Sequence, residues 1–289
     1  GSRKGIPEQL QEDFRVTGLS HIVAISGYNI TLVVSIMMAV FRPLGRRLSI
    51  IISAIAVILF TLFVGASPAV VRACIMGLIA LVALNSERKG DVTIALALTA
   101  TLMIGYNPKI LFHDVGFQLS FLATMGLIYV SPLLEKYFQW LPEKLAIRDS
   151  ILLTLSAQIM ALPIILYNFN NLSVISPISN LLISGPFIPL TMLFGFLGTL
   201  TSYVFLPLAK LVAFPAYLLL EYIVNITHLT ASIPYASVEV SWFSNSLLLG
   251  YFIILATMLK YRWQGEERQH RQIIRRKLEF AQILARKTH

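Results

Sequence analysis

The sequence has few charged residues for its length. Asp, Glu, Lys and Arg make up 13% of its 289 positions, whereas about 25% is usual in soluble globular domains. Apolar side chains make up 56%, and the mean hydropathy is strongly positive. Such a composition leaves too few polar groups to cover a water-soluble fold, so it indicates a protein whose main solvent is a lipid bilayer.

The sequence also lacks the motifs of several enzyme and metal-binding classes. Its one cysteine, Cys74, cannot form an internal disulfide, and no Cys or His pairs stand at zinc-site spacing. No glycine loop ends in Lys-Ser or Lys-Thr, as a nucleotide phosphate loop would, and no Gly-x-Ser-x-Gly string marks a serine hydrolase. We therefore expect no catalytic residues, no metal and no cofactor.

Long apolar runs, each close to the roughly 20 residues that cross a bilayer, follow one another along the chain. They predict nine spans, at residues 17–41, 46–65, 67–84, 91–106, 111–134, 150–168, 186–205, 207–230 and 242–260. A shorter run, Val174–Ile183, would reach only about halfway across the hydrocarbon core as a helix, which indicates a re-entrant segment. The predicted fold is therefore all-α: a polytopic transmembrane helical bundle with broken or re-entrant helices.

Charge and periodicity divide the chain into three parts. Ile6, Leu10 and Phe14 recur at helical spacing, so residues 1–16 are expected to form an amphipathic helix at the membrane interface. Residues 17–260 form the transmembrane domain. Of the 23 basic residues, eight lie within residues 261–289, and every second predicted loop is basic. By the positive-inside rule, this basic tail is cytoplasmic and the N-terminus lies outside.

Arg72 lies inside a predicted span, where an ionised side chain costs roughly 2.5 to 3.5 kcal/mol at the bilayer centre. It stands beside a stripe of small residues, Ala69, Ala73 and Gly77, and such stripes are typical helix-packing faces. The guanidinium should therefore face protein or water, where it could bind a carboxylate, a backbone carbonyl or a phosphate. The alternative is a snorkelling arginine near the interface.

Two interruptions of the apolar pattern are the best indications of a transport pathway. In the first span, Ser26, Gly27 and Asn29 can unwind a helix, and His21 precedes this break. The second break runs from Asn170 to Pro189 and includes Asn180. Polar faces on the fifth and sixth spans add Ser120 and Gln158, while Gln118 points away from that face; such faces can also serve simple interhelical hydrogen bonding.

Three motifs in this order resemble those of the ComEC family competence domain: Thr17-Gly18-Leu19-Ser20-His21 leading to Ala24-Ile25-Ser26-Gly27, then Ala69-Val70-Val71-Arg72-Ala73, then Gly116-Phe117-Gln118-Leu119-Ser120-Phe121. The resemblance covers most of residues 17–260. It implies a multi-pass channel in the bacterial cytoplasmic (inner) membrane that takes up single-stranded DNA during natural transformation. It also implies two partners, a cytoplasmic ATP-driven DNA translocase and an extracytoplasmic DNA receptor. Many relatives carry His where this sequence has Asn29, so a charge role is not expected at that position.

From the residues and the resemblance together, we predict that the DNA path is lined by His21, Ser26, Gly27, Asn29, Arg72, Gln118, Ser120, Gln158 and Asn180. Two other functions remain open on the residues alone. The same broken helices could serve a transporter of small solutes or ions. Alternatively, His113, Asp114 and Glu221 could act as acid and base in a membrane-embedded enzyme that modifies a lipid-linked substrate.

Overall fold

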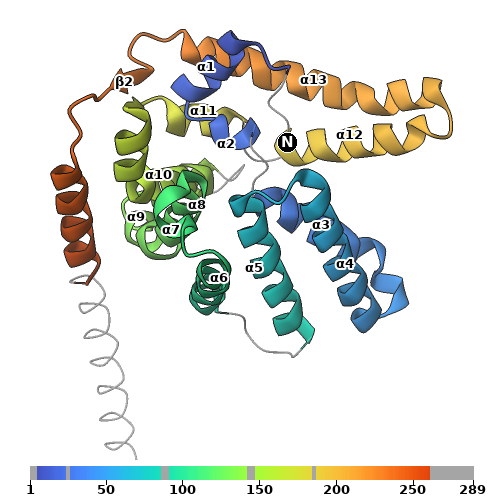
Figure 1. The fold of residues 1–289 in the computed structure, drawn as a ribbon. Coiled ribbons are helices and arrows are strands. Elements are labelled where there is room, and N and C mark those ends of the chain that lie inside the picture. The colour runs from blue at the N-terminus through green and yellow to red at the C-terminus, as the bar shows by residue number, and fades with distance from the viewer. Residues whose placement is uncertain (1–4, 24–26, 86–90, 142–146, 184–186, 261–289) are drawn as a thin grey trace, which may run out of the picture. The chain divides into compact units, whose positions relative to one another are not determined.

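The computed structural model describes residues 5–23, 27–85, 91–141, 147–183 and 187–260, so Ser26 and the predicted basic tail lie outside the described residues. The chain forms two compact units, Gly1–Ser241 and Trp242–His289. Helices form nearly all of the described regular structure, which confirms the all-α prediction (Figure 1).

The second unit holds the described helix Asn245–Lys260. The first unit contains α1 (Glu8–Val16), α2 (Ser20–Val23), α3 (Gly27–Val40), η1 (Arg42–Leu44), α4 (Arg46–Val64), α5 (Pro68–Asn85), α6 (Val92–Tyr106), α7 (Ile110–His113), α8 (Val115–Met125), η2 (Gly126–Val130), α9 (Ser131–Glu135), α10 (Ile147–Phe169), β1 (Asn171–Ser173), α11 (Ser176–Ile183), α12 (Phe187–Ser202), α13 (Leu206–Ala231) and β2 (Ser237–Glu239).

Four described helical stretches are long and apolar enough to cross a membrane alone: α4, the stretch Val115–Glu135 that joins α8, η2 and α9, then α10 and α13. The pair α11 and α12 passes the same test as one span bent by 45°, which confirms the predicted broken or re-entrant helix. Each of the nine predicted ranges contains a described apolar helix, but four of these helices have only 10–17 residues. Nine full crossings therefore stay a prediction.

The small-residue stripe of α5, which the sequence predicted to be a helix-packing face, packs against α3. A Cβ atom built on Gly77 would lie 3.5 Å from Cγ2 of Ile30, and Ala73 is buried in the same cluster as Ile30, Val57 and Val70. Small side chains let the two helix backbones approach closely, and dispersion contacts then replace lipid contacts. Helices α3, α4 and α5 consequently form one packed group.

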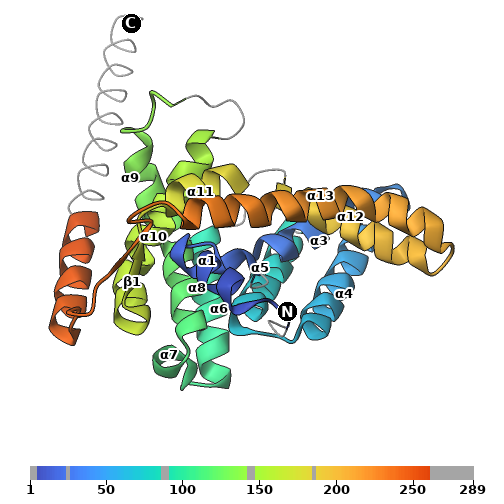
Figure 2. The ribbon, with the colours of Figure 1, turned by 90° about the horizontal axis from the view of Figure 1, so that it is seen from above.

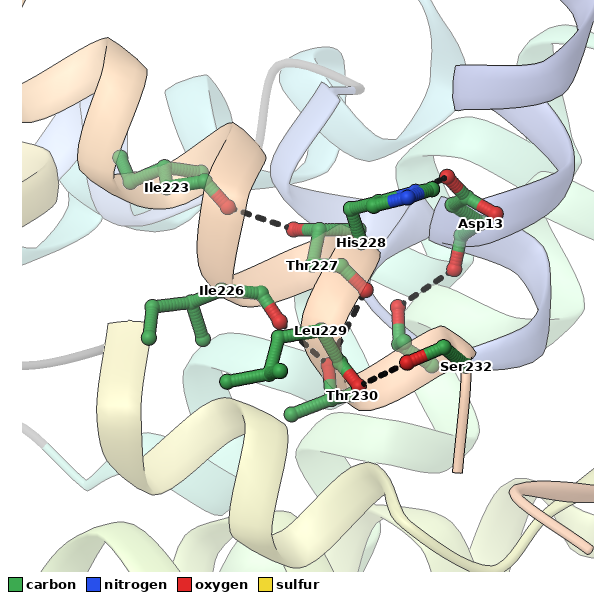
Figure 3. A network of polar contacts seen from close by, with 9 residues as sticks. Asp13, Ile223, Ile226, Thr227, His228, Leu229, Thr230 and Ser232 are labelled. Atoms are coloured by element: carbon green, nitrogen blue, oxygen red, sulfur yellow. Dashed lines mark hydrogen bonds and ion pairs between the residues drawn. The ribbon is translucent and has the colours of Figure 1, made fainter. Parts of the chain in front are cut away.

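Helix α1 is held against the rest of the first unit by its apolar face. Phe14 is buried together with Leu19, Ile183 and Ile223, and Leu10 packs against them. On its other side, Asp13 Oδ2 lies 3.0 Å from His228 Nδ1 near the end of α13 (Figure 3). The apolar face of α1 therefore contacts protein, and the position of this helix at a membrane interface stays a prediction.

Two short strands join distant parts of the first unit. Strand β1 follows α10 and pairs antiparallel with β2, which follows α13, with Leu172 opposite Val238. Three residues are too few for an alternating hydrophobic pattern, so the sequence did not predict either strand. The pairing satisfies backbone groups at a point where the chain leaves both helices.

Helix α10 closely approaches the α8 stretch at Gly126, the first residue of the π-helical turn η2. A Cβ atom built on Gly126 would lie 2.9 Å from the backbone carbonyl carbon of Ser156 and 3.1 Å from Cβ of Met160. Because the obstacle is backbone rather than a flexible side chain, the two helices must separate to accept any larger residue. Gly126 therefore fixes the distance between α8 and α10.

We expect Gly126→Ala to lower the free energy of unfolding by about 1 to 3 kcal/mol, because the added methyl group overpacks the helix contact. The matched control is Gly195→Ala, in the interior of α12, where an added Cβ atom meets no atom within 4 Å. That change should leave stability unchanged or raise it by up to about 1 kcal/mol. Thermal unfolding in one detergent measures both variants, and equal midpoints would contradict the close contact.

Candidate functional site

Arg72 lies on α5 and turns its guanidinium toward α8. Its Nε donates a hydrogen bond to the Ser120 hydroxyl, and Nη1 lies 3.6 Å from Met76 Sδ. The guanidinium carbon is 6.0 Å from the centre of the Phe121 ring, within the range of a cation–π contact. The side chain is half-buried. The guanidinium thus faces protein, as the small-residue stripe beside it predicted.

The positive charge of Arg72 has no carboxylate opposite it among the described residues. A serine hydroxyl, a thioether sulfur and an aromatic face are all neutral partners. They orient the guanidinium without cancelling its charge, and most of its five N–H donors remain available to a bidentate acceptor. The site can therefore attract a phosphate or carboxylate group.

Gly27, the first residue of α3, lies directly against Arg72. A Cβ atom built on Gly27 would be 3.4 Å from Arg72 Nη2 and 3.3 Å from the Cβ atom of Ala73. The absent side chain lets the start of α3 approach the guanidinium. Gly27, Arg72 and Ser120 come from three segments far apart in the sequence, and together with Met76 and Phe121 we call them the Arg72 group. Asn29 follows on α3 and is half-buried.

A second polar group forms where the start of the first predicted span meets the second predicted break. Gly18 has a positive φ of 71°, and a Cβ atom there would lie 2.7 Å from Ser176 Oγ and 3.2 Å from Ser173 Cβ. Its carbonyl oxygen is 3.1 Å from His21 Nδ1. We call the set the Gly18 group: Gly18, His21, Gln158, Ser173, Ser176 and Asn180.

In the Gly18 group, two amide side chains donate hydrogen bonds to residues of the second predicted break. Gln158 on α10 donates from Nε2 to the Ser173 carbonyl oxygen at 2.9 Å. Asn180 on α11 donates from Nδ2 to the Ser176 carbonyl oxygen at 2.9 Å and to the Ser176 hydroxyl at 3.1 Å. Among the described residues, the buried Ser173 hydroxyl has no hydrogen-bond partner, which leaves spare hydrogen-bonding capacity in the group.

The predicted path residues thus fall into separate places. Gly27, Arg72 and Ser120 are together, whereas His21, Gln158 and Asn180 belong to the Gly18 group. Gln118 belongs to neither, because its Nε2 donates to the Leu111 carbonyl oxygen of α7 at 2.9 Å. Ser173 and Ser176 were not predicted as site residues; the Ser-Pro pair that begins α11 was the available signal.

The residues proposed for acid–base chemistry do not form a site in the described structure. Asp114 caps α8, because its Oδ1 accepts the Phe117 backbone N–H at 2.7 Å. Glu221 lies on α13, which has no extensive contact with α7 or α8. Among the described residues, no three His, Cys, Asp or Glu side chains gather where they could hold a metal ion.

Comparisons with known proteins identify relatives of this chain. A family model described as "Competence protein" matches residues 1–265. ComE operon protein 3 of Bacillus subtilis (strain 168) is 28% identical over 184 residues, which are 63% of this chain and 23% of that protein. An uncharacterized protein of Aquifex aeolicus (strain VF5) is 28% identical over 209 residues, 71% of this chain and 47% of the relative. The chain thus spans less than half the length of either relative, and no solved structure matches it.

Gly18→Ala should destabilise the first unit more than Gly65→Ala does. Both glycines have positive φ, so an alanine strains the backbone at either position, but an added Cβ atom meets Ser176 only at Gly18 and open space at Gly65. Because the φ of Gly18, 71°, is nearer the left-handed minimum than the 102° of Gly65, backbone strain alone would not make Gly18→Ala the worse change. The excess loss at Gly18 therefore comes from the close packing and should be about 1 to 3 kcal/mol in the free energy of unfolding. Parallel thermal unfolding of the two variants measures it. Equal losses would mean that Gly18 is not in tight contact with α11.

Proposed function

The chain belongs to the competence protein family, and on that premise we propose that it forms a channel through which a single strand of DNA crosses the bacterial cytoplasmic membrane during natural transformation. The chain is a polytopic membrane protein with broken helices. Interrupted helices supply backbone and side-chain polar groups at membrane depth, where they must face protein or water. Such groups can line an aqueous route for a polar polymer.

The Arg72 group is the observation that carries this proposal. Three sequence segments, each part of a motif that resembles one of the family's, meet around one guanidinium that has no carboxylate partner among the described residues. DNA carries one negative charge per nucleotide and exposes base faces, so a positive group beside an aromatic ring suits both of its features. Phe121, at 6.0 Å from the guanidinium, supplies that ring.

One intramembrane guanidinium would bind a passing strand weakly. Conduction requires that each site release what it binds, so a path lined with many cations would hold the phosphates too tightly. The neutral amides and hydroxyls of the Gly18 group fit the same requirement, because they can exchange hydrogen bonds with a moving strand at little cost. We propose that both groups border the path.

Directional import needs an energy source, and this segment carries no phosphate-binding loop. We propose that the chain is not an enzyme and that its partners are single-stranded DNA, a cytoplasmic ATP-driven translocase that pulls the strand, and an extracytoplasmic DNA receptor that delivers it. The carboxylate of Asp114 accepts a backbone N–H at the start of α8, and this capping role argues against a role as a catalytic acid. A small-solute transporter would share the broken helices but would not need an unpaired guanidinium.

Replacing Arg72 tests the proposal directly. Arg72→Ala should lower strand-specific DNA passage by about tenfold or more, the effect of losing one charge-assisted phosphate contact. Arg72→Lys should retain part of the activity, because it keeps the charge and loses the planar fork. The control is Arg47→Ala, which removes an exposed basic residue at the start of α4. Passage is measured with labelled single strands in vesicles, at equal protein insertion.

If Arg72→Ala conducted DNA as well as the wild type, the guanidinium would have no part in the mechanism. If instead every variant and the wild type moved a small solute but no DNA, the transporter alternative would stand. The two failures are distinguishable in the same vesicles.

Purified chain should hydrolyse ATP no faster than empty vesicles, with or without single-stranded DNA. The reason is that, in this proposal, a separate translocase hydrolyses the ATP. A coupled assay for released phosphate measures the rate, with a heat-unfolded sample as the control. ATP hydrolysis that depends on intact protein would show that this chain is itself an ATPase and would overturn this part of the proposal.

A further inference from the structure

Two exposed arginines lie at one end of α4. Arg42 begins η1 and Arg47 is the second residue of α4, so only a short turn separates them. Among the described residues, neither has a hydrogen-bond or ion-pair partner. Arg46 differs, because its guanidinium donates a hydrogen bond to the Leu84 carbonyl oxygen of α5. We call Arg42 and Arg47 the arginine pair.

The turn that carries the arginine pair is held in place. Gly45, which joins η1 to α4, has a positive φ of 92°, a conformation that glycine adopts without strain. Ser49 is buried on the first turn of α4, and its hydroxyl donates to the Phe41 carbonyl oxygen at 2.6 Å. Because the backbone of the turn is already ordered, the pair loses little conformational freedom when it binds an anion.

An apolar stripe runs along α4 from the arginine pair. Its side chains are 45% to 66% exposed, and we call it the α4 stripe: Leu48, Ile51, Ile55, Leu59 and Leu62. At about 100° per residue, these positions fall within an arc of about 80°. The opposite side of α4 packs on α3 and α5, and its buried residues are Ser49, Ile50, Ser53, Val57 and Thr61. Helix α4 lies at the edge of these helices, with α5 between it and α6 (Figure 2).

The arginine pair and the α4 stripe together match the two parts of a phospholipid. Helix α4 is long and apolar enough to cross a membrane alone, so its exposed apolar side lies against acyl chains. Arginines at the end of such a span lie at the level of the head groups. Half of the hydrocarbon core is about 15 Å thick, which roughly ten helical residues cover. One lipid can therefore place its phosphate on the pair and an acyl chain on the stripe.

The charge of the arginine pair selects among lipids. Guanidinium groups form bidentate hydrogen bonds with phosphate oxygens. Two of them without a carboxylate partner repel a head group that carries its own ammonium, as phosphatidylethanolamine does. The head group of phosphatidylglycerol has a net negative charge and lacks this repulsion. A DNA strand also carries phosphodiesters, but it offers no apolar chain to the α4 stripe, so the two features together favour a lipid.

We propose that the arginine pair and the α4 stripe bind one anionic phospholipid, with its phosphate on Arg42 and Arg47. The site is separate from the candidate DNA path, because Arg46 joins this end of α4 to Leu84, about 18 Å along α5 from Arg72. The inference does not rest on the proposed channel. DNA passage by Arg47→Ala is expected to stay intact although this variant binds lipid less tightly.

Affinity is tested by native mass spectrometry of the full chain in a neutral detergent, titrated with phosphatidylglycerol or phosphatidylethanolamine. The wild type should bind phosphatidylglycerol about tenfold more tightly. The double variant Arg42→Ala/Arg47→Ala should raise the Kd of the first phosphatidylglycerol by about tenfold or more, and lysine at both positions should restore part of the affinity. The matched control is Lys109→Ala/Lys210→Ala, which removes the same charge at exposed positions on other elements.

Three outcomes of this titration would overturn the proposal. An equal rise in Kd in both double variants would show general charge attraction rather than a site. Equal affinity of the wild type for the two lipids would exclude selection by charge. A single-stranded oligonucleotide that binds the wild type but not the arginine variant, with phosphatidylglycerol binding unchanged, would assign the arginine pair to nucleic acid.

The position of the acyl chain is tested in vesicles with a fluorophore on Ile51→Cys in a Cys74→Ala background. Phosphatidylglycerol with a nitroxide on its acyl chain should quench this label more than nitroxide-labelled phosphatidylethanolamine at the same mole fraction. The excess should vanish in the arginine variant. The control is Phe196→Cys on α12, where the replaced side chain is 57% exposed against 55% for Ile51, and both lipids should quench it equally. Equal quenching at Ile51→Cys would refute the site, and so would no quenching, because protein would then cover the stripe.

Discussion

The fold around Arg72 depends on one constraint: a guanidinium placed among membrane helices must be oriented by neighbours that do not neutralise it. In this environment of low dielectric constant a hydrogen bond is stronger than in water, and a buried polar group without a partner costs more free energy. Ser120 supplies a hydroxyl, Phe121 a ring face, and Gly27 the space for the start of α3 to lie alongside. The small residues of α5 then follow as a requirement, because larger ones would push α3 away from the group.

Glycines at contacts set the geometry of the bundle more than large side chains do. Gly18 allows the start of the first predicted span to lie on α11, Gly27 brings α3 to Arg72, and Gly126 brings α8 to α10. Without a hydrophobic effect between helices in lipid, close backbone approach is the main source of dispersion energy. The same absence of side chains leaves polar backbone near the candidate site, so the contacts that pack the helices also shape that site.

The sequence predicted what depends on local pattern. Span positions, the break near Asn180 and the packing stripe beside Arg72 follow from hydropathy and spacing, which need only neighbouring residues. The grouping of the polar residues does not, because Gln158 meets Ser173 and Gly18 meets Ser176 through tertiary contacts. The sequence therefore grouped His21, Gln158 and Asn180 with Arg72 as path residues, but it could not show that they form a separate group around Gly18. The three-residue strands were too short to carry a pattern.

The pairing of β1 with β2 has a topological consequence. The pairing of Leu172 with Val238 holds both strands at one depth, so the chain between them must leave that depth and return to it. Helix α13 and the bent α11–α12 pair are each long and apolar enough for one span, and two such passes in opposite directions meet that requirement. The contact of Gly18 with Ser173 places the same requirement on the preceding part of the chain, for which six spans are predicted. The pairing of two three-residue strands thereby restricts how the chain can pass through the membrane.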